Sequence, residues 1–448
     1  MLLAKRGKTG SGFPVLAKQG KAGSGFSVLV IACIVWLWFR FGNGAEPLFI
    51  MRRIPMYGAS SEVPLRRMSA AKARSPLLNV ILMILYCTIV LGILVVIHEG
   101  GHYLASRAFG VRVTEFMLGM PGPNIGFKKW GTKFGVTPFL LGGYARVCGM
   151  EPGEMSPHLE PVLAALYRRG TANMEDIVRD CGISDEDALK ALDELVDWGS
   201  CTGPTKKDEY NTYRAAEVIP SKKQVRAAVQ AGKPAPQRYA EGQARPVEDA
   251  HALFESEYRQ QYRSLPFWKR SVILLAGIAV NLLFAMLVFV VLFSVIGFDV
   301  RMQSGEVTHM TVDPGRAIVA GFTYIGMVVQ AVAGLFNPAT AAQTVSDSSS
   351  VVGIAVMSKQ FADAGLVPFM QFMAMISVSL GIMNLLPIPP LDGGRFVVEV
   401  FQKLSNKVVS MRAMNAMSAA GMALFLMFFL VMVNQDVQRI ISGTFFGQ

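Results

Sequence analysis

The sequence contains few charged residues, few histidines and no regular cysteine pattern. Only 17% of its 448 residues are charged, whereas 52% are hydrophobic, and this balance is more apolar than that of a typical soluble domain. The five cysteines include no CxxC pair and have no even spacing, so no disulfide framework is indicated. The shortage of charge therefore argues against a soluble globular protein and favours a polytopic membrane protein.

Four apolar runs are each long enough to cross a hydrocarbon core, which takes about twenty residues. They cover 77–97, 271–297, 366–386 and 417–433. Two weaker candidates lie at 27–39 and 317–336. We therefore predict a mainly α-helical membrane protein with four core transmembrane helices, in the regions 76–110, 266–298, 366–395 and 396–448. The last of these regions begins with an amphipathic segment.

The N-terminal region, 1–75, contains a tandem repeat rich in Gly, Ser and Lys, AKRGKTGSGFPVL followed by AKQGKAGSGFSVL. This composition predicts disorder rather than a fold. The apolar run at 27–39 is either a poor signal peptide, an extra apolar helix, or sequence upstream of a genuine start. Such a start could lie at Met51, Met56 or Met68.

The net charge of +11 could indicate a nucleic acid partner, but basic residues kept on the cytoplasmic side of a membrane protein explain it more simply. The segment 299–365 is acidic and 387–415 is basic, which places the first outside and the second in the cytoplasm. We expect a multi-pass protein of the cell membrane whose active site faces the cytoplasmic side. The basic residues at 52–74 disagree with this topology, so either the chain starts later or the orientation is reversed.

The first long apolar run ends in His98-Glu99-Gly100-Gly101-His102. On a helix, residues four apart lie on one face, so His98 and His102 can bind a single metal ion. Glu99 is then close enough to take a proton from a metal-bound water. Chance is the alternative, but polar groups continuing a membrane helix cost several kcal/mol unless they are paired or metal-bound. The motif is the HExxH pattern of zinc hydrolases.

A hydrolytic zinc ion needs three protein ligands and one open position. The remaining histidines, His158, His251 and His309, lie in polar regions away from the predicted spans. Asp392 is the better candidate, because it follows a proline-interrupted apolar helix in the stretch NLLPIPPLDGGR, and the two glycines after it permit a tight backbone. The alternative is that Asp392 only caps the helix that follows.

Two further regions separate the first and second core helices. The segment 111–150 is rich in Gly and β-branched residues and predicts short strands, which should form a membrane-associated β-region packed against the HEGGH helix. The segment 160–215 predicts three helices and a hairpin, in an order that resembles a winged helix-turn-helix. The segment 216–262 has no apolar periodicity over most of its length and predicts a linker.

A DNA-binding role for the 160–215 insert is excluded by charge. Its third predicted helix would repel phosphates, because it carries six carboxylates against Lys190 alone. The six are Asp185, Glu186, Asp187, Asp193, Glu194 and Asp197. We interpret the insert as a cytoplasmic module that contacts a protein partner through a solvated acidic face.

These motifs together resemble the site-2 protease family of intramembrane zinc metalloproteases, of the bacterial regulator-of-sigma-E type. The resemblance covers 77–433 apart from the insert. It rests on HEGGH with its apolar helix, LLGGYARV at 140–147, Gly277-x-x-x-Asn281, SVVGIA at 350–355 and NLLPIPPLDGGR.

The resemblance implies that His98, His102 and Asp392 bind Zn²⁺ and that Glu99 is the general base and acid. It also implies that Asn384 and the Gly142-Gly143 turn of the β-region bind an unwound substrate. The substrates that this resemblance implies are single-span membrane signalling proteins, for example anti-sigma factors, cleaved within the lipid bilayer during regulated intramembrane proteolysis.

The sequence departs from the family pattern in three places. The segment 299–365 is short and shows no clear PDZ pattern, Ile278 stands where the family usually has proline, and the insert at 160–250 is not a common family part. Two other functions also fit a buried His and Asp cluster, namely a membrane metal transporter and a non-proteolytic membrane scaffold. The few polar residues in the other spans argue against a transporter, and the intact Glu99 argues against a scaffold.

Overall fold

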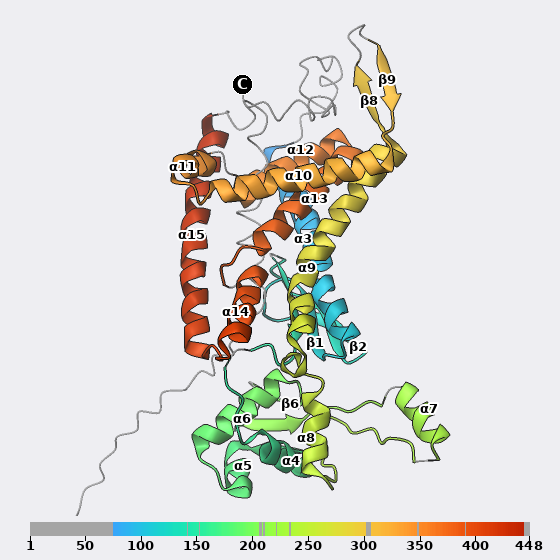
Figure 1. Cartoon of the computed structure of the whole chain (residues 1–448), viewed down its shortest axis with the longest axis vertical. Coiled ribbons are helices and arrows are strands. Elements are labelled where there is room, and N and C mark those ends of the chain that lie inside the picture. Colours follow the sequence, from blue (N-terminus) through green and yellow to red (C-terminus); the bar gives the residue numbers. More distant parts are fainter. Residues whose placement is uncertain are drawn as a thin grey trace, which may run out of the picture.

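The computed structural model describes residues 75–140, 142–151, 153–205, 208, 211–220, 222–232, 234–301, 306–346, 349–389 and 391–442. The predictions for the N-terminal region, including the apolar run at 27–39, fall outside this part of the chain. Figure 1 shows a bundle of long helices with a separate smaller domain at one end.

The four predicted spans are helices. They are α3 (Pro76–Ala108), α9 (Phe267–Val290), α13 (Leu366–Asn384) and α15 (Met411–Ser442). Helix α3 begins at Pro76 because the side chain of Ser75 caps it by accepting from the N–H of Leu78. Helix α9 continues into a π-helical turn, η4 (Val291–Ile296).

The weaker candidate at 317–336 is also a helix, α10 (Pro314–Gly334). It is the fifth helix in the described chain that is long and apolar enough to cross a membrane. Figure 1 shows, however, that α10 lies across one end of the bundle rather than along the other long helices. This arrangement is consistent with a core of four transmembrane helices. Length and apolarity alone do not determine the direction of a helix, so they do not distinguish α10 from the other four.

The bundle is built around α13, the most buried of the long helices. Helix α9 packs against both α3 and α13, and apolar side chains from all three helices form one continuous core. Small residues allow close approach, because a Cβ on Gly101 of α3 would lie 2.5 Å from the carbonyl oxygen of Ala276 on α9. The backbones of α3 and α9 therefore touch directly beside the HEGGH motif.

The predicted β-region is a four-stranded sheet. Its strands are β1 (Val113–Leu118), β2 (Ile125–Lys129), β3 (Thr132–Val136) and β4 (Gly143–Val147), in the spatial order β2-β3-β1-β4. Strands β1 and β3 are parallel, and the other two pairs are antiparallel. Strand β4 is thus an edge strand, and it contacts α3.

The insert has its own apolar core. Its elements are α4 (Leu159–Arg169), β5 (Thr171–Asn173), α5 (Met174–Cys181), α6 (Asp185–Asp197), β6 (Cys201–Thr202) and β7 (Thr212–Ala215). The strands pair in the order β5-β7-β6. The three helices lie where the apolar periodicity predicted them, and Trp198 is almost fully buried among them.

The prediction that 216–262 is a linker is wrong for the last part of this segment, which packs on the insert. The first half of 216–262 contains the short helix α7 (Lys222–Gln230). The last part contains α8 (Ala250–Tyr258) and the start of a short 3₁₀ turn, η3 (Tyr262–Ser264). Leu253, Phe254 and Tyr258 of α8 pack on the core of the insert, where the last two rings lie against Trp198. The error arose because α8 is short and its few apolar residues have a partner only in the folded insert.

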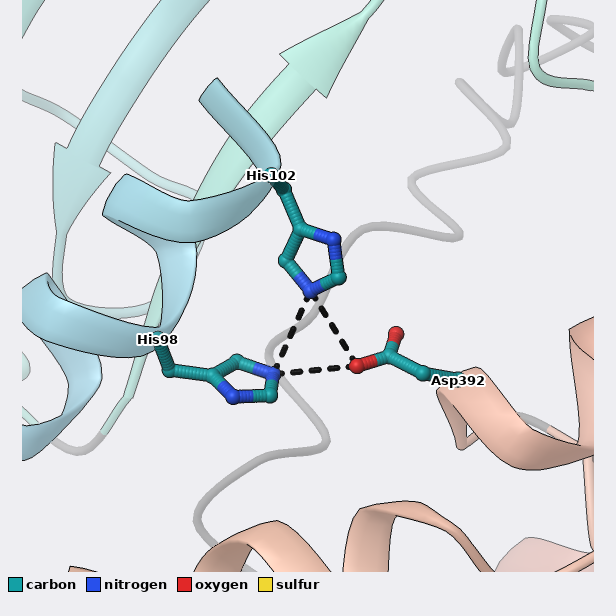
Figure 2. Close-up of side chains that lie close together, drawn as sticks. All are labelled: His98, His102 and Asp392. Carbon is teal, nitrogen blue, oxygen red and sulfur yellow. Dashed lines mark hydrogen bonds and ion pairs between the residues drawn. The ribbon is translucent and has the colours of Figure 1, made fainter. Parts of the chain in front are cut away.

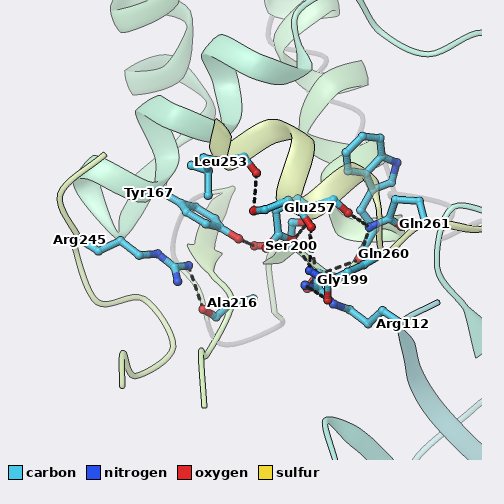
Figure 3. A network of polar contacts seen from close by, with 12 residues as sticks. Arg112, Tyr167, Gly199, Ser200, Ala216, Arg245, Leu253, Glu257, Gln260 and Gln261 are labelled. Atoms are coloured by element: carbon cyan, nitrogen blue, oxygen red, sulfur yellow. Dashed lines mark hydrogen bonds and ion pairs between the residues drawn. The ribbon is translucent and has the colours of Figure 1, made fainter. Parts of the chain in front are cut away.

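The insert is joined to the four-stranded sheet by a network around Arg112, which lies between α3 and β1 (Figure 3). Its guanidinium donates to the carbonyl oxygen of Gly199 at 3.0 Å, to Glu257 Oε2 at 2.8 Å and to Gln260 Oε1 at 3.0 Å. The hydroxyl of Ser200 donates to the same Glu257 oxygen at 2.6 Å. The insert is therefore fixed to the sheet by direct contacts and not only by the chain connection.

The remaining elements lie after α9. They are β8 (Phe298–Arg301), β9 (Val307–Met310), α10, α11 (Pro338–Ser346), α12 (Val351–Ala364) and α14 (Asp392–Ser405). Strands β8 and β9 form one hairpin. The described part of 299–365 thus consists of a hairpin and three helices, in keeping with the missing PDZ pattern.

Candidate metal centre and active site

Three side chains predicted as metal ligands meet at one point (Figure 2). Nε2 of His98 lies 3.4 Å from Nε2 of His102, and Oδ2 of Asp392 lies 3.0 Å from the first and 3.1 Å from the second. The two histidines come from α3, and the aspartate is the first residue of α14. The three form the one group of potential metal ligands found among the described residues.

The chain before Asp392 folds back tightly, as the sequence predicted from its prolines and glycines. A Cβ on Gly393 would lie 2.2 Å from the carbonyl oxygen of Leu385, and one on Gly394 would lie 2.3 Å from the nitrogen of Pro389. The helix cap is Leu391, which makes no side-chain cap bond. The alternative in which Asp392 serves only as a cap is therefore wrong, because its carboxylate points to the two imidazoles.

The geometry fits zinc. Ligand atoms around a tetrahedral zinc ion lie about 3.3–3.4 Å apart, close to the spacing of these three atoms. Space for an ion is kept free by Gly277 of α9, since a Cβ there would lie 2.4 Å from His102 Nε2 and 2.8 Å from His98 Cε1. Two imidazoles and a carboxylate are also a ligand set used by catalytic zinc.

The polar side chains that α3 contributes to the site are shielded from solvent, whereas Asp392 is partly exposed. His98, Glu99 and His102 are only 2%, 4% and 8% exposed. Nδ1 of His102 donates to the carbonyl oxygen of Ile273 at 2.8 Å, which leaves Nε2 free to bind metal. Glu99 Oε2 accepts from the backbone N–H of Ala145 on β4 at 2.9 Å. The edge strand of the sheet therefore lies directly beside the glutamate.

The residues predicted to bind substrate lie at two different elements, the start of β4 and the end of α13. Gly143 begins β4 and packs on α3, since a Cβ there would lie 2.5 Å from Val95 Cγ1 and 3.7 Å from Glu99 Cγ. Gly142 precedes it with a positive φ of 112°. Asn384 is buried at the end of α13, where its amide donates to the carbonyl oxygen of Leu380 at 3.1 Å. Gly143 therefore lies directly against α3, beside Glu99.

Three histidines lie outside the site, as expected. His158 lies 4.0 Å from Asp187, His251 pairs with Glu160 and His309 pairs with Asp299. Sequence reasoning from the residues alone missed the contribution of Ile273, which acts through its backbone. The one signal that could have pointed to it is its place one helical turn before Gly277.

Comparison with known proteins agrees with this geometry. A model of peptidase family M50 matches residues 86–428, which include HEGGH and Asp392. The chain belongs to peptidase family M50. Among curated M50-type relatives, it is 23% identical to zinc metalloprotease RasP of Geobacillus kaustophilus over 434 residues, covering 78% of this chain and 96% of that protein. It is 24% identical to regulator of sigma-W protease RasP of Bacillus subtilis over 441 residues, covering 79% of this chain and 97% of that protein.

Membership in family M50 confirms the resemblance to site-2 proteases. The chain is a zinc metalloprotease, and the alternatives of a metal transporter and a non-proteolytic scaffold are set aside. Its apolar helices make it a multi-pass membrane protein.

Proposed function

We propose that His98, His102 and Asp392 hold the catalytic zinc ion of this M50 protease and that Glu99 moves the proton. The observation that supports this assignment is the triangle of ligand atoms, which joins two residues of α3 to the start of α14 with edges of 3.0–3.4 Å. Bound zinc would supply a Lewis acid that activates water and polarises the scissile carbonyl.

Glu99 is the acid–base group in this proposal. It follows His98 on α3, and its buried carboxylate is held by the N–H of Ala145. From there, Glu99 takes a proton from the attacking water and returns it to the nitrogen of the leaving amine. The surrounding apolar core keeps bulk water away from both transfers.

The substrate lies along the edge strand β4. A transmembrane helix must unwind before hydrolysis, because its carbonyls are otherwise hydrogen-bonded within the helix. An extended segment can then add to an open sheet edge. Gly143 lets β4 approach α3 closely, and Gly142 supplies the positive φ before it, so a segment added beside β4 would pass next to Glu99. Asn384 is the second substrate contact in this proposal: one of its amide hydrogens is used in the bond to Leu380, and its amide oxygen can accept from an unwound segment.

The substrates are single-span membrane signalling proteins, such as anti-sigma factors. The similarity to a protein named regulator of sigma-W protease supports this class. The active site opens toward the cytoplasmic side. This orientation is supported by the basic loop around α14 and by the acidic segment 299–365 at the other end of the bundle.

The insert is a winged-helix-like module that binds a protein partner. Its order of helix, strand, two helices and two strands, with an antiparallel sheet, supports this assignment. Helix α6 opens with Asp185, Glu186 and Asp187, and this acidic surface is suited to a basic protein rather than to nucleic acid.

Cleavage of a model single-span substrate by the purified protein in detergent tests the proposed chemistry. Glu99→Gln should lower the cleavage rate about 100-fold or more and leave bound zinc unchanged. The matched control is Glu306→Gln, which alters an exposed carboxylate far from the site and should cleave normally. Cleavage that survives Glu99→Gln would overturn the role of Glu99, and wild-type cleavage that survives full removal of zinc would overturn the metal site.

A further inference from the structure

One face of α9 supports the two histidines of α3. Ile273, Gly277 and Asn281 are each four residues apart, so they lie above one another on the same side of the helix. Ile273 presents its carbonyl oxygen to His102, and Gly277 leaves space beside both rings. Asn281 is the third member of this face, and it lies next to His98.

The side chain of Asn281 has no access to solvent, and its amide faces His98. Its Nδ2 lies 3.2 Å from Nδ1 of His98, while its Oδ1 is buried and has no hydrogen-bond partner among the residues that the structure describes. A buried amide oxygen without a donor costs about 1–3 kcal/mol in free energy of folding, so such an arrangement calls for an explanation.

Metal binding at His98 would determine which atom of the Asn281 amide faces the ring. If Nε2 of His98 binds zinc, the hydrogen of the neutral ring is on Nδ1, which is then a donor. Two donors cannot pair, but a half-turn of the Asn281 amide exchanges its nitrogen and oxygen, which are assigned from the hydrogen-bond network. The oxygen would then accept from Nδ1 of His98 in the same place.

We infer that Asn281 is a positioning residue, whose side-chain oxygen accepts the Nδ1 hydrogen of His98 and so keeps Nε2 directed at the metal. This inference rests on the proposed function, in which His98 is a zinc ligand. Two groups of α9 then have the same role, which is to accept the Nδ1 hydrogen of a histidine on α3. The carbonyl oxygen of Ile273 does so for His102, and the amide oxygen of Asn281 does so for His98.

The backbone of Asn281 is itself fixed. Its carbonyl oxygen accepts from the hydroxyl of Ser377 on α13 at 2.9 Å, and both residues are fully buried. This contact joins α9 to α13 at the level of the metal site. The position of the Asn281 amide relative to His98 is therefore set by the packing of three helices, which suits a group that must orient a ring.

The affinity for zinc, measured by competition with a chromophoric chelator on the purified full chain, tests this inference. Asn281→Leu has a similar size but no acceptor, so it should bind zinc about 10–100-fold more weakly. Asn281→Asp keeps an acceptor oxygen and should restore the affinity to within a few-fold of wild type. If the leucine variant does not fold, Asn281→Ala serves in its place, because it removes the acceptor without adding bulk.

Two controls separate the outcomes. Ser379→Ala removes another buried polar group from the same core and should leave zinc affinity unchanged. His98→Ala tests the proposed ligand itself and should abolish tight binding. If His98→Ala has no effect, the proposed function fails. If His98→Ala abolishes zinc binding while Asn281→Leu and Asn281→Ala bind zinc normally, the role of Asn281 as an acceptor is overturned. The same holds if Asn281→Asp binds zinc as weakly as the leucine and alanine variants.

Discussion

His102 and Asp392 are 290 positions apart in the chain, yet Nε2 of the first lies 3.1 Å from Oδ2 of the second. The contact joins the end of α3 to the beginning of α14. It exists because α9 packs against both of these helices, so that each is held at a fixed distance from the other. The metal site is thus a direct product of the helix bundle, and changes in the bundle should alter it.

Replacement of Asp392 by asparagine should remove zinc. The variant keeps the shape of the side chain but loses the negative charge that the third ligand supplies. Loss of a residue that only hydrogen-bonds to a metal ligand lowers metal affinity about 10–100-fold. Loss of a ligand itself should therefore weaken zinc binding by more than about 100-fold. Zinc content after dialysis, measured by atomic emission, gives the answer. Asp185→Asn, at the exposed start of α6, is the control, and full zinc content in Asp392→Asn would contradict the ligand assignment.

A methyl group at position 277 should block the site. In Gly277→Ala, the new Cβ would lie 2.4 Å from His102 Nε2, and a contact this short cannot be tolerated without displacing the ring. We expect both the zinc content and the cleavage rate to fall at least about 10-fold. This loss should occur even though alanine has a higher helix propensity than glycine and would by itself stabilise α9. Gly326→Ala on α10 is the matched control, because a Cβ there meets nothing within 4 Å. Normal zinc binding by Gly277→Ala would show that the rings do not need this space.

Helix α15 should depend on one buried carboxylate. Asp436 is fully buried and accepts from the backbone N–H groups of Ser350 and Gly353 at the start of α12. Asp436→Ala would leave these donors unpaired and should lower the free energy of unfolding by about 1–3 kcal/mol. Thermal unfolding in detergent measures the change, with the exposed Gln438→Ala as the control. An unchanged unfolding midpoint in Asp436→Ala would mean that α15 is held by apolar packing alone.

The insert should become less stable as pH rises. Burial raises the pKa of Asp197 to about 7, with Glu151 adding to the effect and Arg146, Arg263 and the N–H of Gly149 opposing it. Because the pKa is higher in the folded than in the unfolded chain, the folded state holds the proton more strongly between about pH 4 and 7. Stability is therefore greatest at low pH and declines as pH rises toward 7.

Asp197→Asn tests this decline. Asparagine cannot ionise, and its amide oxygen can still accept from Gly149, so the variant should gain stability relative to wild type between pH 5 and 8, reaching about 1–3 kcal/mol. Unfolding of the insert can be followed through hydrogen exchange of helix α6, which ends at Asp197. The exposed Asp185→Asn should follow wild type, and parallel curves for Asp197→Asn and wild type would refute the assignment.

The positions of the long helices and three of the site residues could be predicted because their signals are local. An uncharged run long enough for a bilayer, followed by imidazoles at i and i+4, specifies a helix and a metal-binding face. The prediction of Asp392 needed only the prolines that end one helix and the glycines that start the next. The strands of the β-region and the helices of the insert were likewise visible as periodic patterns.

Other features could not be predicted in this way. The direction of α10 across the bundle depends on what it packs against, and α8 has too few apolar residues to be recognised without the core that receives them. The position of β4 at the edge of the sheet, beside Glu99, arises from strand order, which no single strand encodes.

The sequence by itself thus determined the chemistry of this protein: two imidazoles, a glutamate and a distant aspartate, placed at the ends of apolar helices where such groups need a metal. Only the tertiary structure decided how these groups are held. A carbonyl oxygen at Ile273, an absent side chain at Gly277 and an amide at Asn281 act through position rather than residue chemistry. Their effect requires α9 to lie against α3, and that contact forms only when the helices pack.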